Sequence, residues 1–206
     1  ISDGTLVTLI QRDGEQFVVA LATSSGKSIW QTAVAVEYRN SMGHGPRATP
    51  SISGNSVYAF TGQGILASLN VKSGKINWSR NGLRELNGRP AEYGMACSPL
   101  IVGTQVIVTI GAPRATVVAC DLDSGKTLWT VGHDTTGYSS PPYSRSGADF
   151  RSLSTRAAPS SDSNPRSADN CGAILTRHPM TATSQPPSQS VARCSFHPEK
   201  TTAAPS

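Results

Sequence analysis

Short apolar runs alternate with polar turns along the first two thirds of the chain. One pattern occurs three times: an apolar strand, a polar turn ending in Ser-Gly-Lys, and a second strand closed by Trp. The copies read VVALATSSGKSIW at 18–30, LASLNVKSGKINW at 66–78 and VVACDLDSGKTLW at 117–129. Aliphatic and β-branched runs bounded by such turns are typical of strands. The pattern therefore predicts a series of short antiparallel strands.

The three copies recur at a nearly constant interval. Their tryptophans, the only three in the chain, are 48 and 51 residues apart, and the turn glycines keep the same two intervals. A period of about 50 residues with four strands per unit is typical of a β-propeller, in which each repeat forms one blade. We therefore expect an all-β fold, an incomplete β-propeller of about three four-stranded antiparallel blades. The repeated motif residues are Gly26, Lys27, Trp30, Gly74, Lys75, Trp78, Gly125, Lys126 and Trp129, with Asp121 in the third copy.

The pattern divides the chain into two parts. We expect a partial propeller over residues 1–138, with blades at about 1–36, 49–80 and 97–131. The first unit lacks the strand that opens the other two, and the sequence begins inside a strand pattern, so we expect the natural chain to be longer. Residues 139–206 are rich in Ser and Pro and poor in large aliphatic residues, a composition typical of disordered segments.

Two interpretations of this tail stay open. The repeat begins again at Ser140-Pro141 and then stops, because residues 142–206 contain no Gly-Lys-x-x-Trp. One interpretation is a natural disordered tail, and the other is a shift of the reading frame near residue 141. In another frame, the codons of Cys171 and Gly172 allow a tryptophan codon. The nucleotide sequence of the gene decides between the two.

The chemistry of the motif residues points to a structural role. Glycine gives the positive φ that a tight turn requires, without a Cβ clash. Tryptophan in the outermost strand of a unit offers a large flat surface for packing between blades. We therefore interpret the motif as the element that joins one blade to the next.

The repeat resembles that of the pyrroloquinoline-quinone-like (PQQ-like) β-propellers, which typically reads Ala-x-Asp-x-x-Thr-Gly-Lys-x-x-Trp. The third copy matches best, with Asp121 at the Asp position and Ser124 in place of Thr. The second copy has Asn70 at the Asp position, and the first has Ala22, so the first lacks this polar contact. The resemblance extends from residue 1 to about residue 138.

The PQQ-like family contains both enzymes and non-enzymatic proteins. Its quinoprotein dehydrogenases typically carry an adjacent Cys-Cys pair over the quinone, a calcium ion held by Glu, Asn and Asp, and an Asp base. This sequence has no adjacent Cys pair. The resemblance therefore implies a non-catalytic scaffold or binding module, with no catalytic, cofactor-binding or metal-binding residue, in the periplasm or outside the cell. Two alternatives stay open: a fragment of a PQQ-dependent dehydrogenase, which requires PQQ and calcium, and a sensor or extracellular domain of a larger protein.

Candidate binding residues lie in the connections between blades. In a propeller these connections gather at one end of the central channel, and loops on a rigid scaffold commonly carry binding residues. Arg47 and Tyr93 precede expected inner strands, and Tyr138 lies in the third connection. We expect these three side chains to face a protein or small-molecule ligand. The connections are residues 37–48, 80–97 and 131–140.

Charge and cysteine content narrow the range of partners. The net charge is +5, but the 18 Lys and Arg residues do not cluster, so we expect no nucleic-acid partner. No apolar stretch approaches the ~20 residues that span a bilayer, so we expect no membrane span. The cysteines lack metal-ligand spacing, and we expect Cys97 and Cys120 to be buried thiols. Three blades leave sheet faces and edges open, which predicts self-association.

Overall fold

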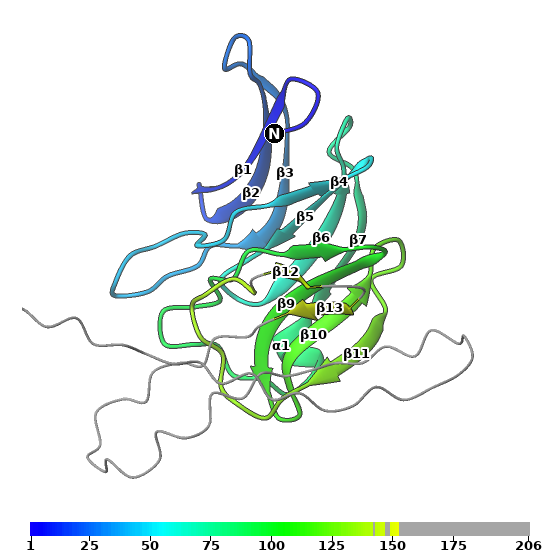
Figure 1. Cartoon of the computed structure of the whole chain (residues 1–206). Helices are drawn as coiled ribbons and strands as arrows, with labels where there is room; N and C mark the ends of the chain where they lie inside the picture. The colour runs from blue at the N-terminus through cyan, green and yellow to red at the C-terminus, as the bar shows by residue number, and fades with distance from the viewer. Residues whose placement is uncertain (142, 147–148, 153–206) are drawn as a thin grey trace, which may run out of the picture. The chain divides into compact units, whose positions relative to one another are not determined.

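The computed structural model describes residues 1–141, 143–146 and 149–152. Within them the chain forms a succession of antiparallel sheets, each built from consecutive strands (Figure 1). The two interpretations of the tail, disorder and a shifted reading frame, concern residues that lie almost entirely outside this described part. Both therefore stay predictions.

The first sheet has three strands, β1 (Thr5–Arg12), β2 (Glu15–Ala22) and β3 (Ser28–Val36), in the order β1-β2-β3. Asp13 and Gly14 join β1 to β2, and both have positive φ angles, 50° and 81°. Two consecutive left-handed residues are typical of the tight turn of a β-hairpin. The first unit of the sequence pattern likewise predicts three strands.

The second and third sheets each have four strands in sequential order. The second sheet contains β4 (Ser51–Ser53), β5 (Ser56–Phe60), β6 (Ile65–Asn70) and β7 (Ile76–Asn81). The third sheet contains β8 (Leu100–Val102), β9 (Gln105–Ala112), β10 (Ala115–Asp121) and β11 (Thr127–Val131). A short hairpin follows, formed by β12 (Tyr143–Ser146) and β13 (Asp149–Ser152). The expected all-β class, with antiparallel sheets of three or four strands, is confirmed.

One helical turn, α1 (Gly82–Glu85), interrupts the connection after β7. The Asn81 side chain accepts a hydrogen bond from the Arg84 backbone N–H, so it caps the start of the turn. The sequence pattern predicts only a connection between blades over residues 80–97, so this helical turn is a difference from the prediction.

The apolar core lies between neighbouring sheets. Val18 and Ala20 of β2 pack with Ala67 and Leu69 of β6, which joins the first sheet to the second. A larger cluster joins the second sheet to the third and includes the fully buried Phe60. Strands that face another sheet on both sides carry continuous apolar runs. This explains why β5 and β6 do not alternate between apolar and polar residues, because the second sheet packs against the first sheet on one face and the third sheet on the other.

Hydrogen bonds link the residues that open successive units, each of which precedes a proline. The Ser98 hydroxyl accepts a hydrogen bond from the Thr49 N–H, at 3.0 Å. The Ser140 hydroxyl accepts one from the Ser98 N–H, at 2.8 Å. Each of these three residues precedes a proline. The restart of the repeat at Ser140-Pro141 therefore continues the contacts of the preceding units.

Candidate functional site

The tryptophan of the first sheet lies on the glycine turn of the second. The Trp30 indole N–H donates to the Val71 carbonyl at 2.9 Å, and the Thr32 hydroxyl donates to the Gly74 carbonyl at 2.7 Å. A Cβ atom on Gly74 would lie 2.6 Å from the indole ring. Gly74 also has a φ of 70°. Glycine is therefore required at this turn for two independent reasons.

The same arrangement joins the second sheet to the third. The Trp78 indole N–H donates to the Leu122 carbonyl at 2.9 Å, and a Cβ atom on Gly125 would lie 2.7 Å from the indole. Arg80 replaces the threonine of the first contact and donates to the Gly125 carbonyl at 2.6 Å. Arg80 also pairs with Glu85, the last residue of α1. We call the Trp30–Gly74 and Trp78–Gly125 contacts the two docks.

In each dock, the side chain at the Asp position of the motif stabilises the glycine turn. The Asp121 carboxylate accepts hydrogen bonds from the Ser124 N–H and hydroxyl, at 2.8 and 2.7 Å. These bonds lower the pKa of Asp121. The Asn70 side chain accepts the equivalent bonds from Ser73 in the second turn. Ala22 holds this position in the first turn and has no side chain that accepts a hydrogen bond.

The connections between sheets meet around Tyr38. A Cβ atom on Gly62 would lie 2.9 Å from the Tyr38 ring, and one on Gly94 would lie 2.6 Å from it. The guanidinium of Arg47 lies over the Tyr38 ring, 5.4 Å from the ring centroid. Loops after β3, β5 and α1 therefore contact a single aromatic ring.

Arg47, Tyr93 and Tyr138, the three predicted ligand-facing residues, lie together beside this ring. Arg47 donates hydrogen bonds to the Tyr93 carbonyl and, at 2.8 Å, to the Gly43 carbonyl. The Tyr138 hydroxyl accepts a bond from the Tyr93 N–H, and the two tyrosine rings have centroids 5.5 Å apart. The rings stay 37% and 45% exposed, and the side chain of Met42 is 70% exposed. We call Tyr38, Arg47, Tyr93 and Tyr138 the loop face.

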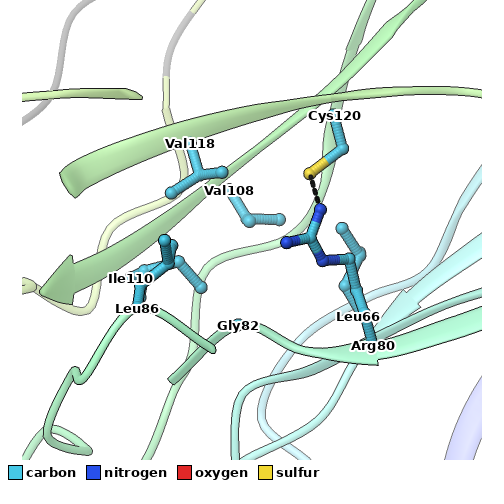
Figure 2. Close-up of a pocket in the computed structure, with 8 residues that line it drawn as sticks. All are labelled: Leu66, Arg80, Gly82, Leu86, Val108, Ile110, Val118 and Cys120. Carbon is cyan, nitrogen blue, oxygen red and sulfur yellow. Dashed lines mark hydrogen bonds between the residues drawn. The ribbon is translucent and has the colours of Figure 1, made fainter. Parts of the chain in front are cut away.

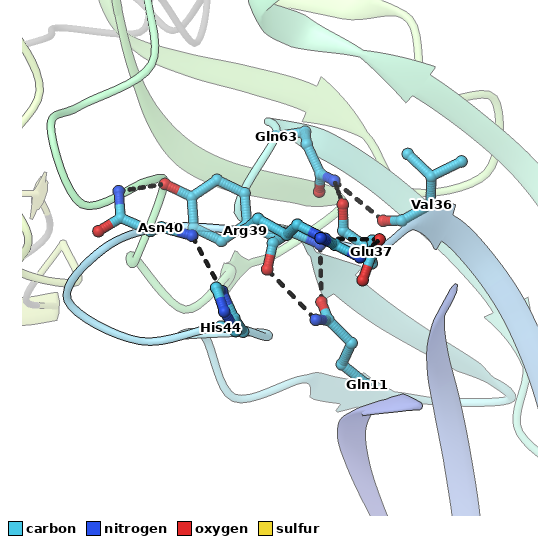
Figure 3. Close-up of polar contacts among 8 residues, drawn as sticks. Gln11, Val36, Glu37, Arg39, Asn40, His44 and Gln63 are labelled. Carbon is cyan, nitrogen blue, oxygen red and sulfur yellow. Dashed lines mark hydrogen bonds and ion pairs between the residues drawn. The ribbon is translucent and has the colours of Figure 1, made fainter. Parts of the chain in front are cut away.

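Hydrogen bonds hold the start of the connection that follows β3, residues 37–48, in place (Figure 3). Gln11 binds both backbone groups of Tyr38, and Gln63 donates to the carbonyls of Val36 and Glu37. His44 accepts a hydrogen bond from the Asn40 N–H through Nδ1, at 3.2 Å. The first connection is therefore anchored to both the first and the second sheet.

A small cavity between the second and third sheets is lined mainly by aliphatic side chains (Figure 2). Its polar groups are the Arg80 guanidinium and the Cys120 thiol, 3.5 Å apart. Burial raises the pKa of Cys120, and Arg80 acts in the opposite direction. Cys97 is likewise a buried free thiol, as expected, and burial raises its pKa. The lining residues are Leu66, Arg80, Gly82, Leu86, Val108, Ile110, Val118 and Cys120.

These residues do not fit a quinone cofactor with its calcium ion. The cavity offers one thiol and one guanidinium among aliphatic side chains, with no adjacent cysteine pair. No group of three His, Cys, Asp or Glu side chains within the described ranges is placed to hold a metal ion. The described part of the chain also contains no helix with the length and apolar character needed to cross a membrane.

Comparison with known proteins identifies the repeat. The family described as outer membrane protein assembly factor BamB matches residues 2–141. The chain belongs to this family. Its relatives include a quinohemoprotein alcohol dehydrogenase as well as BamB, and both are propeller proteins. The family match ends where Ser140-Pro141 begins the next unit.

Individual relatives match only part of their own length. The chain is 31% identical over 120 residues to quinohemoprotein alcohol dehydrogenase ADH IIB of Pseudomonas putida, covering 54% of this chain and 17% of that protein. The crystal structure of BamB from Moraxella catarrhalis aligns with a TM-score of 0.50 at 21% identity, over 73% of this chain and 40% of that one. The structure of quinohemoprotein alcohol dehydrogenase ADHIIG of Pseudomonas putida HK5 aligns with a TM-score of 0.46 at 21% identity. The alignment covers 63% of this chain and 19% of that one.

Sequence reasoning missed two residues that organise the site. Tyr38 is the ring on which the loops pack, and the glycines at 62 and 94 that admit it do not belong to the repeated motif. Arg80 joins the second dock to α1. Arg80 lies two residues after Trp78, as Thr32 lies two residues after Trp30. A hydrogen-bond donor at this spacing was therefore the sequence signal that could have identified Arg80.

Proposed function

We propose that the chain forms part of a non-catalytic PQQ-like propeller module that binds a protein partner through the loop face. The observation that carries this proposal is the meeting of Arg47, Tyr93 and Tyr138. These residues come from three different connections, and none belongs to the repeated motif. They are not part of the indole-on-glycine contacts that join the sheets.

The composition and rigidity of the loop face favour a protein partner. Tyrosine, methionine and arginine are enriched at protein interfaces, and rigid aromatic side chains lose little conformational entropy on binding. Two backbone carbonyls and the Tyr38 ring fix Arg47 before any partner arrives. The exposed rings of Tyr93 and Tyr138 supply apolar area beside this fixed charge. The name of the family refers to outer-membrane protein assembly, and we extend the proposal to a location in the cell envelope.

The second candidate is a fragment of a PQQ-dependent dehydrogenase. The 31% identity to a quinohemoprotein alcohol dehydrogenase favours it. The sequence has no adjacent cysteine pair, and no group of three His, Cys, Asp or Glu side chains in the described ranges is placed to hold a metal ion. The two candidates predict different behaviour of the full-length natural protein.

Site-specific photocrosslinking in the cells that produce the protein tests the first candidate. A photoreactive phenylalanine at Tyr138, which is 45% exposed, is compared with one at Leu128, which is 48% exposed on β11. We expect a protein adduct of defined mass from position 138 and none from position 128. Equal adducts at both positions, or none at position 138, would contradict the proposal.

A redox assay tests the second candidate. The full-length protein is supplied with PQQ and calcium, and reduction of a dye by alcohols or sugars is followed. Our proposal predicts no turnover above that of a heat-denatured control. Turnover that depends on both PQQ and calcium would replace the binding function with a dehydrogenase.

A further inference from the structure

The turn that carries Tyr93, residues 91–94, is held by side chains of the two other connections. One backbone hydrogen bond closes this turn, from its last N–H to its first carbonyl, at 2.9 Å. Within the described ranges its two central residues make no hydrogen bond to another backbone group. The carbonyl before Tyr93 accepts from Asn40, and the Tyr93 carbonyl accepts from Arg47. The Tyr93 N–H donates to the Tyr138 hydroxyl at 3.3 Å. The position of Tyr93 therefore depends on the first and third connections.

Asn40 is the residue of the first connection that links this turn to the centre of the site. Its side-chain nitrogen, Nδ2, donates to the Glu92 carbonyl at 2.8 Å and to the Tyr38 hydroxyl at 3.3 Å. Its side-chain oxygen, Oδ1, accepts from the Met42 N–H at 3.0 Å. Asn40 is half-buried. One side chain therefore joins the second connection, the ring on which the loops pack and the backbone of its own loop.

The partners of Asn40 require an amide at this position. A backbone carbonyl only accepts and a backbone N–H only donates, so Glu92 and Met42 determine which end of the amide is nitrogen. A carboxylate has two accepting oxygens and no donor. Aspartate would therefore keep the bond from Met42 and place an acceptor against the Glu92 carbonyl. It has nearly the same size as asparagine, so the substitution removes the donor and adds a charge without changing the volume.

We propose that Asn40 is the positioning residue of the loop face. Its amide nitrogen holds the 91–94 turn beside Tyr38, and this places the Tyr93 carbonyl where Arg47 binds it. The loop face is then ordered before the protein partner arrives, which lowers the entropic cost of association. Asn40 acts through Tyr93 and Arg47 rather than by contact with the partner. This inference rests on the proposed function, because it concerns binding of a protein to the loop face.

Asn70 provides a matched control for the change from asparagine to aspartate. Its Oδ1 accepts hydrogen bonds from the N–H and the hydroxyl of Ser73, at 3.0 and 3.1 Å. Asp121 holds the equivalent position in the third turn and accepts the same two bonds from Ser124. Asn70→Asp therefore adds the same charge as Asn40→Asp but keeps the bonds of its turn.

A fluorinated tyrosine at position 93 tests the positioning without a partner. It is introduced into the full-length protein, and its fluorine resonance is compared between variants. Asn40→Asp should shift and broaden the resonance, because the turn has lost the bond that holds it, and Asn70→Asp should keep the wild-type resonance. Asn40→Ala removes the donor without adding a charge and should reproduce the change. A wild-type resonance in Asn40→Asp or in Asn40→Ala would overturn the proposal, even if either variant is less stable.

Photocrosslinking from position 138 measures the consequence for partner binding. At matched amounts of folded protein, Asn40→Asp and Asn40→Ala should lower the yield of the partner adduct roughly tenfold. Asn70→Asp should leave the yield unchanged.

The two measurements separate failure of this inference from failure of the proposed function. A wild type that forms no adduct would contradict the proposed function, and the fluorine comparison would still decide whether Asn40 positions Tyr93. A wild type that forms the adduct, with the same yield from Asn40→Asp and Asn40→Ala, would overturn the role of Asn40 and leave the binding function standing.

Discussion

Trp30 and Tyr138 are both large aromatic residues, but their surroundings differ. Trp30 lies on a glycine turn, and its polar atom binds a backbone carbonyl of the next sheet. Tyr138 is 45% exposed and contacts another exposed tyrosine. The first residue belongs to a motif that recurs, and the second does not. The difference separates residues that join the sheets from residues available to a partner.

The largest expected effect is that of a single methyl group at a filled dock. Gly74→Ala combines backbone strain at positive φ with a clash against Trp30, and we expect a loss of about 3 kcal/mol in the free energy of unfolding. Gly26→Ala introduces the same backbone strain, but its Cβ would have no neighbour within 4 Å. It should therefore lower the free energy of unfolding by only about 1 kcal/mol. Denaturant unfolding of dilute protein measures both. Equal losses would show that Trp30 does not rest on Gly74.

A smaller effect is expected from the indole N–H. Trp78→Phe removes the hydrogen bond to the Leu122 carbonyl and some packing volume, at a cost of about 2 kcal/mol. Trp129→Phe loses a bond to the Gln105 side chain of the same sheet, and we expect roughly half that cost. The same unfolding experiment compares them. A larger loss for Trp129→Phe would reverse our assignment of which tryptophan joins two sheets.

A substitution in the loop face should affect partner binding and leave the free energy of unfolding nearly unchanged. Tyr138→Ala removes an exposed ring, so the free energy of unfolding should change by about 0.5 kcal/mol or less. The same substitution should remove the partner adduct formed from a photoreactive group at Tyr93. A loss of stability comparable to that of Trp78→Phe would place Tyr138 among the structural residues.

The smallest effect concerns Asp121 and pH. Its pKa in the folded chain lies below the ordinary value of 3.8, so its stabilising contribution is present above that value and is lost as the pH falls through the folded pKa. Asp121→Asn should leave stability at neutral pH nearly unchanged, because Asn70 makes the same bonds in the second turn. Unfolding measured down to about pH 3 should then show a weaker pH dependence than the wild type. An unchanged dependence would contradict this assignment.

The repeat made the sheets predictable, because its signals are local. Strands, turns and their glycines are encoded within a few residues, and Trp30, Trp78 and Trp129 mark the same strand of each unit. The helical turn α1 was not predicted, because a single Asn81 cap before four residues is too weak a local signal.

The loop face was only partly predictable, because it depends on contacts distant in sequence. Arg47, Tyr93 and Tyr138 were found from their positions in the connections between blades. The ring of Tyr38 lies between Gly62 and Gly94, which are far apart in the sequence and outside the motif. No periodic or local pattern marks such a contact. Its recognition required the fold.

A double-mutant cycle between Trp30 and Gly74 tests most directly whether successive sheets are joined by an indole on a glycine turn. In a Trp30→Ala background the clash is gone, so Gly74→Ala should cost only the strain seen at Gly26, about 1 kcal/mol. The coupling energy between the two sites should therefore be about 2 kcal/mol. If Gly74→Ala costs the same with and without Trp30, the docks do not hold the sheets together in the way described.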